Sequence, residues 1–181
     1  DELSLIEKNK EIDSGLTNFN NPINKVSFHR VGFVINNKGV ETPLLKNINF
    51  EINRGEVTSI VGESGSGKTT LIELLPKLIV PSSGDLLIDG VFIDQVSTSN
   101  LRSKIAYLPQ KSQIFDGTIR EHIKYGNKSI SDSELENALL LSSSRNFVSK
   151  FSHGADTLIG SKGVKLSGGQ EKKIDLARAL A

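Results

Sequence analysis

The stretch "VGESGSGKTTLIELL" (Val61–Leu75) has the spacing of a phosphate-binding loop, because it fits the pattern G-x-x-x-x-G-K-[ST]. Glycines allow the backbone to turn tightly and to point its N–H groups inward. Lys68 adds a positive charge for β- and γ-phosphates, and the Thr69 hydroxyl is an oxygen ligand of the kind that Mg²⁺ prefers. The loop is therefore predicted to bind a nucleotide through Gly62, Glu63, Ser64, Gly65, Ser66, Gly67, Lys68, Thr69 and Thr70.

The elements predicted on both sides of this loop support that interpretation. The apolar segment "EVTSIV" (56–61) is typical of a buried strand that runs into the loop. After the loop, a helix is predicted, whose apolar face is formed at helical spacing by Leu71, Leu74, Leu75 and Leu78. Pro76 is expected to kink this helix, since proline removes a backbone donor. The alternative, a Gly/Ser-rich turn with an incidental lysine, would need neither the strand nor the helix.

The rest of the chain alternates between strand and helix patterns. "VSFHRVGFVI" (26–35) predicts a strand with one register break, and Asp89-Gly90 predicts the turn of a hairpin. "IAYLP" (105–109) predicts another buried strand. From Thr118 to Phe151 the pattern is mostly helical, with a capping box at Ser131 and Glu134. Further predictions are a strand at 48–52, a turn at 53–55, a terminal helix from about 168, and a polar linker or arm at 1–24.

Composition excludes several classes of function. The chain has no cysteine, which excludes disulfides and thiolate metal sites, and its histidines show no metal-ligand spacing. Its 22 basic and 21 acidic residues nearly cancel, so composition gives no argument for a nucleic-acid partner. No apolar run reaches the roughly 18 residues of a membrane span. The absence of methionine indicates a piece of a longer protein.

A second motif, "KLSGGQEKKIDLARAL" (165–180), identifies a family. Alone, it would be a Ser/Gly turn in which Ser167 caps a helix. Together with the first motif, the chain from about Val26 onward resembles the nucleotide-binding domain of ATP-binding cassette (ABC) transporters. Leu166–Gln170 resembles the family's signature, and "YLPQ" (107–110) resembles its Q-loop. Two further segments resemble the corresponding segments of exporter-type members: "IFDGTIREHIKYG" (114–126) and "DTLIGSKGVKLSGGQ" (156–170).

The resemblance implies an α/β fold. It would be a P-loop NTPase core of mixed or parallel sheet with helices, an N-terminal antiparallel β-subdomain and a helical subdomain at about 111–165. Residues 25–181 would form the nucleotide-binding domain, and 1–24 the linker from a preceding membrane domain. In the family, a strand with a Mg²⁺-binding aspartate, a glutamate general base and a histidine follow the signature. None of these is in this chain, so part of the core is expected to be missing and the piece alone to be inactive.

The resemblance also implies a mechanism and partners. Two such domains, identical or different, would pair head to tail around MgATP. They would lie at the cytoplasmic face of the cell membrane and couple ATP hydrolysis to transport through a transmembrane domain. Lys68 and Gln110 would be catalytic residues, and Thr69 and Gln110 would hold Mg²⁺. Gln110 would also contact the nucleotide bound at the P-loop. The signature would reach the ATP of the partner domain through Ser167, Gly168, Gly169 and Gln170.

Two positions depart from the family pattern. Ile35 occupies the place of an aromatic residue that stacks on adenine, which predicts weaker or less base-selective binding. Ser161 replaces a glutamate of the exporter pattern G-E-x-G, so the usual contact with the membrane domain is in doubt.

Two alternative functions remain open at this point. The chain as given would bind nucleotide without turnover, or it would belong to a soluble ABC ATPase of DNA repair or translation. The exporter-like segment 114–126 and the balanced charge disfavour the second alternative.

Overall fold

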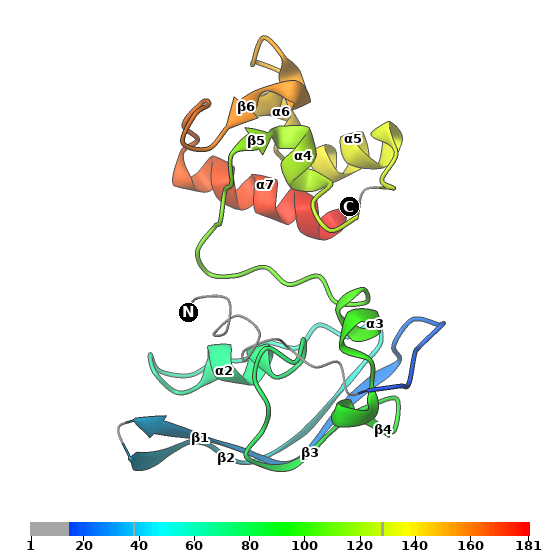
Figure 1. Ribbon diagram of the computed structural model, residues 1–181, viewed down its shortest axis with the longest axis vertical. Coiled ribbons are helices and arrows are strands. Elements are labelled where there is room, and N and C mark those ends of the chain that lie inside the picture. Colours follow the sequence, from blue (N-terminus) through cyan, green and yellow to red (C-terminus); the bar gives the residue numbers. More distant parts are fainter. Residues whose placement is uncertain (1–14, 38, 128) are drawn as a thin grey trace, which may run out of the picture. The chain divides into compact units, whose positions relative to one another are not determined.

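The computed structural model describes residues 15–37, 39–127 and 129–181. The chain divides into two compact units: the first ends at Ile105, and the second covers Ala106–Ala181 (Figure 1). Each unit has its own hydrophobic core. None of the described helices has the length and apolar character needed to cross a membrane.

The first unit is built on an antiparallel sheet with the strand order β2-β1-β3-β4. The predicted register break in β1 is confirmed between Phe28 and Val31, but it is not the only one in the pairing with β2. The register shifts again between Val31 and Phe33 and between Phe33 and Val34. The predicted hairpin is confirmed too. Its turn residues Asp89 and Gly90 have φ of 48° and 82°, and both positions of a type I′ turn require positive φ. The strands are β1 Lys25–Asn37, β2 Val40–Asn53, β3 Ser83–Ile88 and β4 Val91–Phe92.

Helix α2 (Lys68–Glu73) covers one face of this sheet (Figure 1). Its Leu71 and the following Leu74 are buried against Phe28 and other sheet residues, and Phe28 stacks on Phe50 with ring centroids 4.4 Å apart. This packing connects the phosphate-binding loop to the core. The unit is completed by η1 (Ile93–Gln95) and α3 (Thr98–Arg102).

The predicted linker 1–24 falls partly outside the described residues, which begin at 15. Its described part lies along the first unit: Thr17 forms a parallel bridge with Val96, and the backbone N–H of Phe19 donates to Asn100 Oδ1 at 2.7 Å. The role of this segment as a linker stays a prediction.

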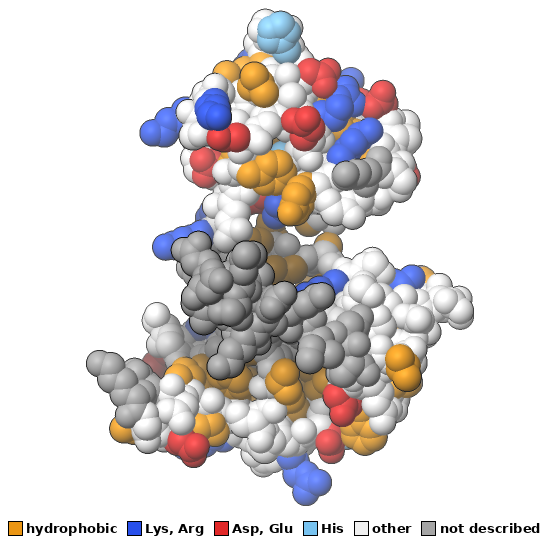
Figure 2. Space-filling view, in the orientation of Figure 1, with side chains coloured by type: hydrophobic (Ala, Val, Ile, Leu, Met, Phe, Trp, Pro, Cys, Tyr) orange, Lys and Arg blue, Asp and Glu red, His pale blue; other side chains and the backbone are white. Residues whose placement is uncertain are grey.

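Three predicted features of secondary structure are wrong. Segments 56–61 and 105–109 are not strands, and no described strand pairs with either of them. A strand requires a neighbour that satisfies its backbone groups. Without one, Val57 and Val61 are 96% and 89% exposed. Hydrophobic side chains reach the surface of both units (Figure 2). Helix α2 ends at Glu73 and does not continue through a kink at Pro76, because proline disfavours helical backbone in the residue before it.

The second unit is mainly helical, as predicted for Thr118–Phe151 and the terminal helix. Its longest helix, α7 (Gly168–Leu180), packs against α4 and α5 (Figure 1). The predicted capping box of Ser131 and Glu134 is confirmed at the start of α5. The remaining elements are β5 Gly117–Thr118, α4 Ile119–Ile123, α5 Asp132–Leu141, α6 Arg145–Val148, η2 Gly154–Asp156 and β6 Leu158–Ile159, with β5 and β6 antiparallel.

Candidate functional site

The phosphate-binding loop closes around the ammonium group of Lys68. Nζ of Lys68 donates to the backbone carbonyl oxygens of Gly62 at 2.8 Å and Glu63 at 2.6 Å, and lies 3.5 Å from Ser66 Oγ. Two turns of the loop require positive φ, which is 82° at Gly65 and 87° at Gly67. The lysine therefore points into the loop, at the place where a phosphate group would offer it stronger acceptors than carbonyls.

The end of the loop is held against strand β2. A Cβ atom at Gly67 would lie 2.7 Å from Leu45 Cδ2 and 3.1 Å from Leu44 Cγ, so only glycine fits there without a shift. At Gly62, a Cβ would lie 2.8 Å from Ser66 Oγ. A larger residue at position 62 would therefore reach into the loop, whereas one at position 67 would collide with strand β2.

The side chains beside the loop suit a magnesium nucleotide. Thr69, in the first turn of α2, is exposed, so its hydroxyl is open to a metal ion. Thr70 is half-buried, and Ser64 is exposed. Hydroxyl oxygens and phosphates form the usual surroundings of Mg²⁺. The residues present therefore fit a nucleotide that carries this ion.

The signature forms the start of helix α7 in the second unit. Ser167 caps the helix, as predicted: its Oγ accepts from the N–H of Gln170 at 3.4 Å, and its own N–H donates to Gln170 Oε1 at 2.9 Å. Gly168 and Gly169 are exposed, with nothing within 4 Å of a Cβ built on either. A 13-residue helix thus presents its positive end and open backbone N–H groups to solvent, a surface that favours an anion.

The remaining predicted site residues are exposed. Gln110 belongs to the second unit, like the signature, whereas Lys68 and Thr69 belong to the first. Ile35, on β1, is 43% exposed and pairs with Thr42 of β2. An exposed aliphatic side chain is consistent with a surface for a base, but the roles of Ile35 and Gln110 stay predictions.

Ser161 has an intrachain partner that the sequence did not reveal. Its hydroxyl donates to the carboxylate of Asp116, at 2.9 Å from Oδ1 and 2.7 Å from Oδ2. Hydrogen bonds from the side chain and backbone of Ser161 lower the pKa of Asp116, and the backbone of Lys162 adds to this. The segment that leads into the signature is therefore fixed to the residue before β5.

A buried hydrogen bond between two titratable side chains was also missed. His122 of α4 contacts Asp175 of α7, with Nε2 and Oδ1 3.0 Å apart, and neither side chain reaches solvent. The two residues are far apart in the sequence, and each is a single polar residue in an otherwise ordinary helix pattern. No local signal would have identified this contact.

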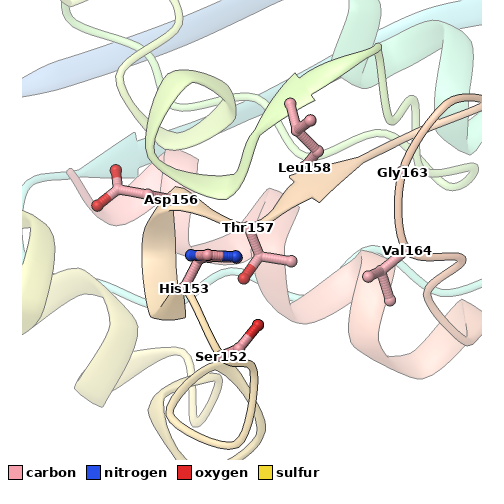
Figure 3. A pocket seen from close by; sticks show the side chains of 7 residues that line it. All are labelled: Ser152, His153, Asp156, Thr157, Leu158, Gly163 and Val164. Atoms are coloured by element: carbon pink, nitrogen blue, oxygen red, sulfur yellow. The ribbon is translucent and has the colours of Figure 1, made fainter.

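A pocket of about 540 Å³ lies elsewhere in the second unit (Figure 3). None of the predicted site residues contributes to it. The pocket is lined by Ser152, His153, Asp156, Thr157, Leu158, Gly163 and Val164.

Among the residues that the structure describes, no group of three or more His, Cys, Asp or Glu is arranged to hold a metal ion.

Comparisons with known proteins agree with the two motifs. The ABC transporter family matches residues 45–181. The chain is 39% identical over 156 residues to an ATP-dependent lipid A-core flippase of Syntrophus aciditrophicus, covering 86% of this chain and 25% of that protein. It is 38% identical over 154 residues to a putative multidrug export ATP-binding/permease protein of Staphylococcus aureus, covering 85% of this chain and 26% of that protein.

A solved structure of a bacterial Atm1-family ABC exporter with ATP bound is similar as well. It superposes with a TM-score of 0.85 and 32% identity, covering 98% of this chain and 31% of that one. The chain thus spans about a quarter to a third of the length of these relatives. It has their α/β fold, as predicted, and the family binds ATP. By its family match and by the phosphate-binding loop and signature that it carries, this chain belongs to the ABC transporter family.

Proposed function

We propose that this chain is the ATP-binding domain of an ABC exporter, which binds MgATP and, in the whole protein, couples ATP hydrolysis to transport across a membrane. The observation that carries the proposal is the closed loop around Lys68, whose ammonium group contacts two carbonyl oxygens at 2.8 and 2.6 Å. Phosphate oxygens carry more negative charge than carbonyls and would replace them as acceptors. The loop thus holds the lysine ready for the β- and γ-phosphates.

The signature supports a dimer in this proposal. Its capped helix start is exposed, and a γ-phosphate bound by a second ATP-binding domain would meet Ser167 and the N–H groups of Gly168 and Gly169 there. The partner domain is either a second copy or a different chain. Thr69 and Gln110 would supply ligands to Mg²⁺, and the bound ion would neutralise the phosphate charge during transfer to water.

The relatives support the remaining partners of the proposal. The names of these relatives describe a flippase and a multidrug export permease, so the whole protein would contain a transmembrane domain. The ATP-binding domain would then lie at the cytoplasmic face of the membrane. A nucleic-acid partner is not proposed, since the formal net charge of the chain is only +1.

The experiment is phosphate release by the full-length protein in lipid vesicles, measured as a function of ATP and Mg²⁺. Thr69→Ala should lower the rate at least tenfold at limiting Mg²⁺, because it removes a metal ligand, while Thr69→Ser keeps the hydroxyl and should stay close to wild type. A full-length protein that releases no phosphate, or a Thr69→Ala variant that needs no more Mg²⁺ than Thr69→Ser, would contradict the proposal.

A further inference from the structure

A buried polar linkage joins the signature helix to the rest of the second unit. His122 on α4 is 0% exposed and Asp175 on α7 is 1% exposed, and His122 Nε2 lies 3.0 Å from Asp175 Oδ1. The same carboxylate oxygen lies 3.2 Å from Nη2 of Arg178, one turn further along α7. Burial of a carboxylate costs free energy unless it is paired, so this linkage constrains where α7 can lie.

Apart from this linkage, α7 is held by apolar packing. Besides Asp175, its buried residues are Ile174 and the small Ala177, which belong to the core that α4 and α5 share. Apolar packing is non-directional, so it tolerates a slide or rotation of the helix at modest cost. The hydrogen bond between His122 and Asp175 does not, because a shift of about 1 Å breaks it and leaves a buried carboxylate without this partner. The polar linkage therefore selects one register of α7 on α4.

The environment of His122 keeps the linkage in one protonation state. Burial lowers the pKa of His122, and the hydrogen bond to Asp175 acts in the opposite direction. The ring is therefore neutral near pH 7. It donates from Nε2 to the carboxylate, while Nδ1 has no hydrogen-bond partner among the described residues. The ring of Phe115 packs on that of His122, with centroids 4.5 Å apart.

We propose that His122 and Asp175 are positioning residues for the signature: they hold α7 so that Ser167 and Gly168, at its start, meet the ATP of the partner domain. The helix is continuous from Gly168 through Asp175, so a shift of the helix at Asp175 also moves the cap, roughly 12 Å away. A misplacement of about 1 Å at a reacting centre is enough to lower a rate about 100-fold. The inference rests on the proposed function, since it assigns a role within that composite site.

The experiment measures kcat for ATP hydrolysis and the Kd for ATP in the full-length protein. His122→Leu and Asp175→Leu should lower kcat at least tenfold, with the Kd within twofold of wild type, because ATP is bound mainly by the loop around Lys68. His122→Gln places an N–H donor near the position of the ring Nε2 and should keep kcat within threefold. His153→Leu removes an exposed histidine of the same unit and should leave both values unchanged.

A double variant separates positioning from stability. His122→Leu/Asp175→Leu replaces a buried polar pair by apolar groups, an exchange that often preserves folding. We expect it to melt near the wild-type temperature while its kcat stays at least tenfold low. Wild-type kcat in the double variant, or a His122→Gln variant as slow as His122→Leu, would overturn the inference. A wild-type protein that neither binds nor hydrolyses ATP would instead overturn the proposed function.

Discussion

Replacement of Lys68 by alanine should weaken ATP binding by about 10- to 150-fold. In the free protein, Nζ of Lys68 makes charge-assisted hydrogen bonds to the carbonyl oxygens of Gly62 and Glu63. ATP would exchange these acceptors for phosphate oxygens, and one hydrogen bond to a charged group contributes about 1.5–3 kcal/mol. Since each 1.4 kcal/mol corresponds to about a factor of ten in Kd, the loss of one such bond gives the stated range.

The assay is titration of the full-length protein with a fluorescent ATP analogue in the presence of Mg²⁺. Lys46→Ala is the matched control, because Lys46 is an exposed lysine of the same unit, on β2. It removes the same charge without touching the loop and should change the Kd less than twofold. A Kd of Lys68→Ala within threefold of that of Lys46→Ala would show that the phosphates do not lie at this ammonium group.

Three further predictions concern the loop, the base and the buried histidine. Gly67→Ala should lower the free energy of unfolding by about 1–3 kcal/mol more than Gly65→Ala. Both positions have positive φ, but only the Cβ at position 67 meets Leu45, at 2.7 Å; equal losses in denaturant unfolding would contradict this. Ile35→Tyr should strengthen ATP binding and increase the preference for ATP over GTP, because a tyrosine ring that stacks on the base adds about 1 kcal/mol. Unchanged Kd values for both nucleotides would contradict this prediction. Acidification from pH 7.5 to 5.5 should destabilise wild type more than His122→Gln in denaturant unfolding. Burial lowers the pKa of His122, which lies beside Asp175 and Arg178. As the pH falls below about 6.5, this histidine therefore takes up a proton in the unfolded chain before it does so in the folded one, which favours unfolding. An equal pH dependence of the free energy of unfolding in the two proteins would exclude this cause.

Features specified by short stretches of sequence could be predicted. The break in β1, the turn at Asp89-Gly90 and the caps at Ser131 and Ser167 each depend on residues within a few positions of one another. The phosphate-binding loop belongs to the same class, because its glycines and Lys68 lie within seven consecutive residues, 62–68. Local geometry of this kind is determined by backbone sterics and short-range hydrogen bonds.

Features that depend on distant partners could not be predicted. Segment 56–61 has the composition of a buried strand, but composition does not supply the neighbouring strand that a ladder needs. The linkage of His122 with Asp175 joins residues 53 positions apart, and the contact of Ser161 with Asp116 joins residues 45 positions apart. Each of these polar residues is unremarkable in its own segment. Only the packing of α4 and α7 in the folded unit reveals the first of the two contacts.

In the proposed dimer, a partner domain covers the exposed start of α7 when ATP binds. Gly169 is open to solvent and the chain contains no cysteine, so a thiol introduced by Gly169→Cys has no competitor within this chain. The measurement is the rate of maleimide modification at this position in the full-length protein, followed by mass spectrometry, with Ser149→Cys as the exposed control. We expect ATP with Mg²⁺ to slow modification at least tenfold at position 169 and to leave position 149 unchanged. Equal rates with and without ATP at position 169 would contradict it.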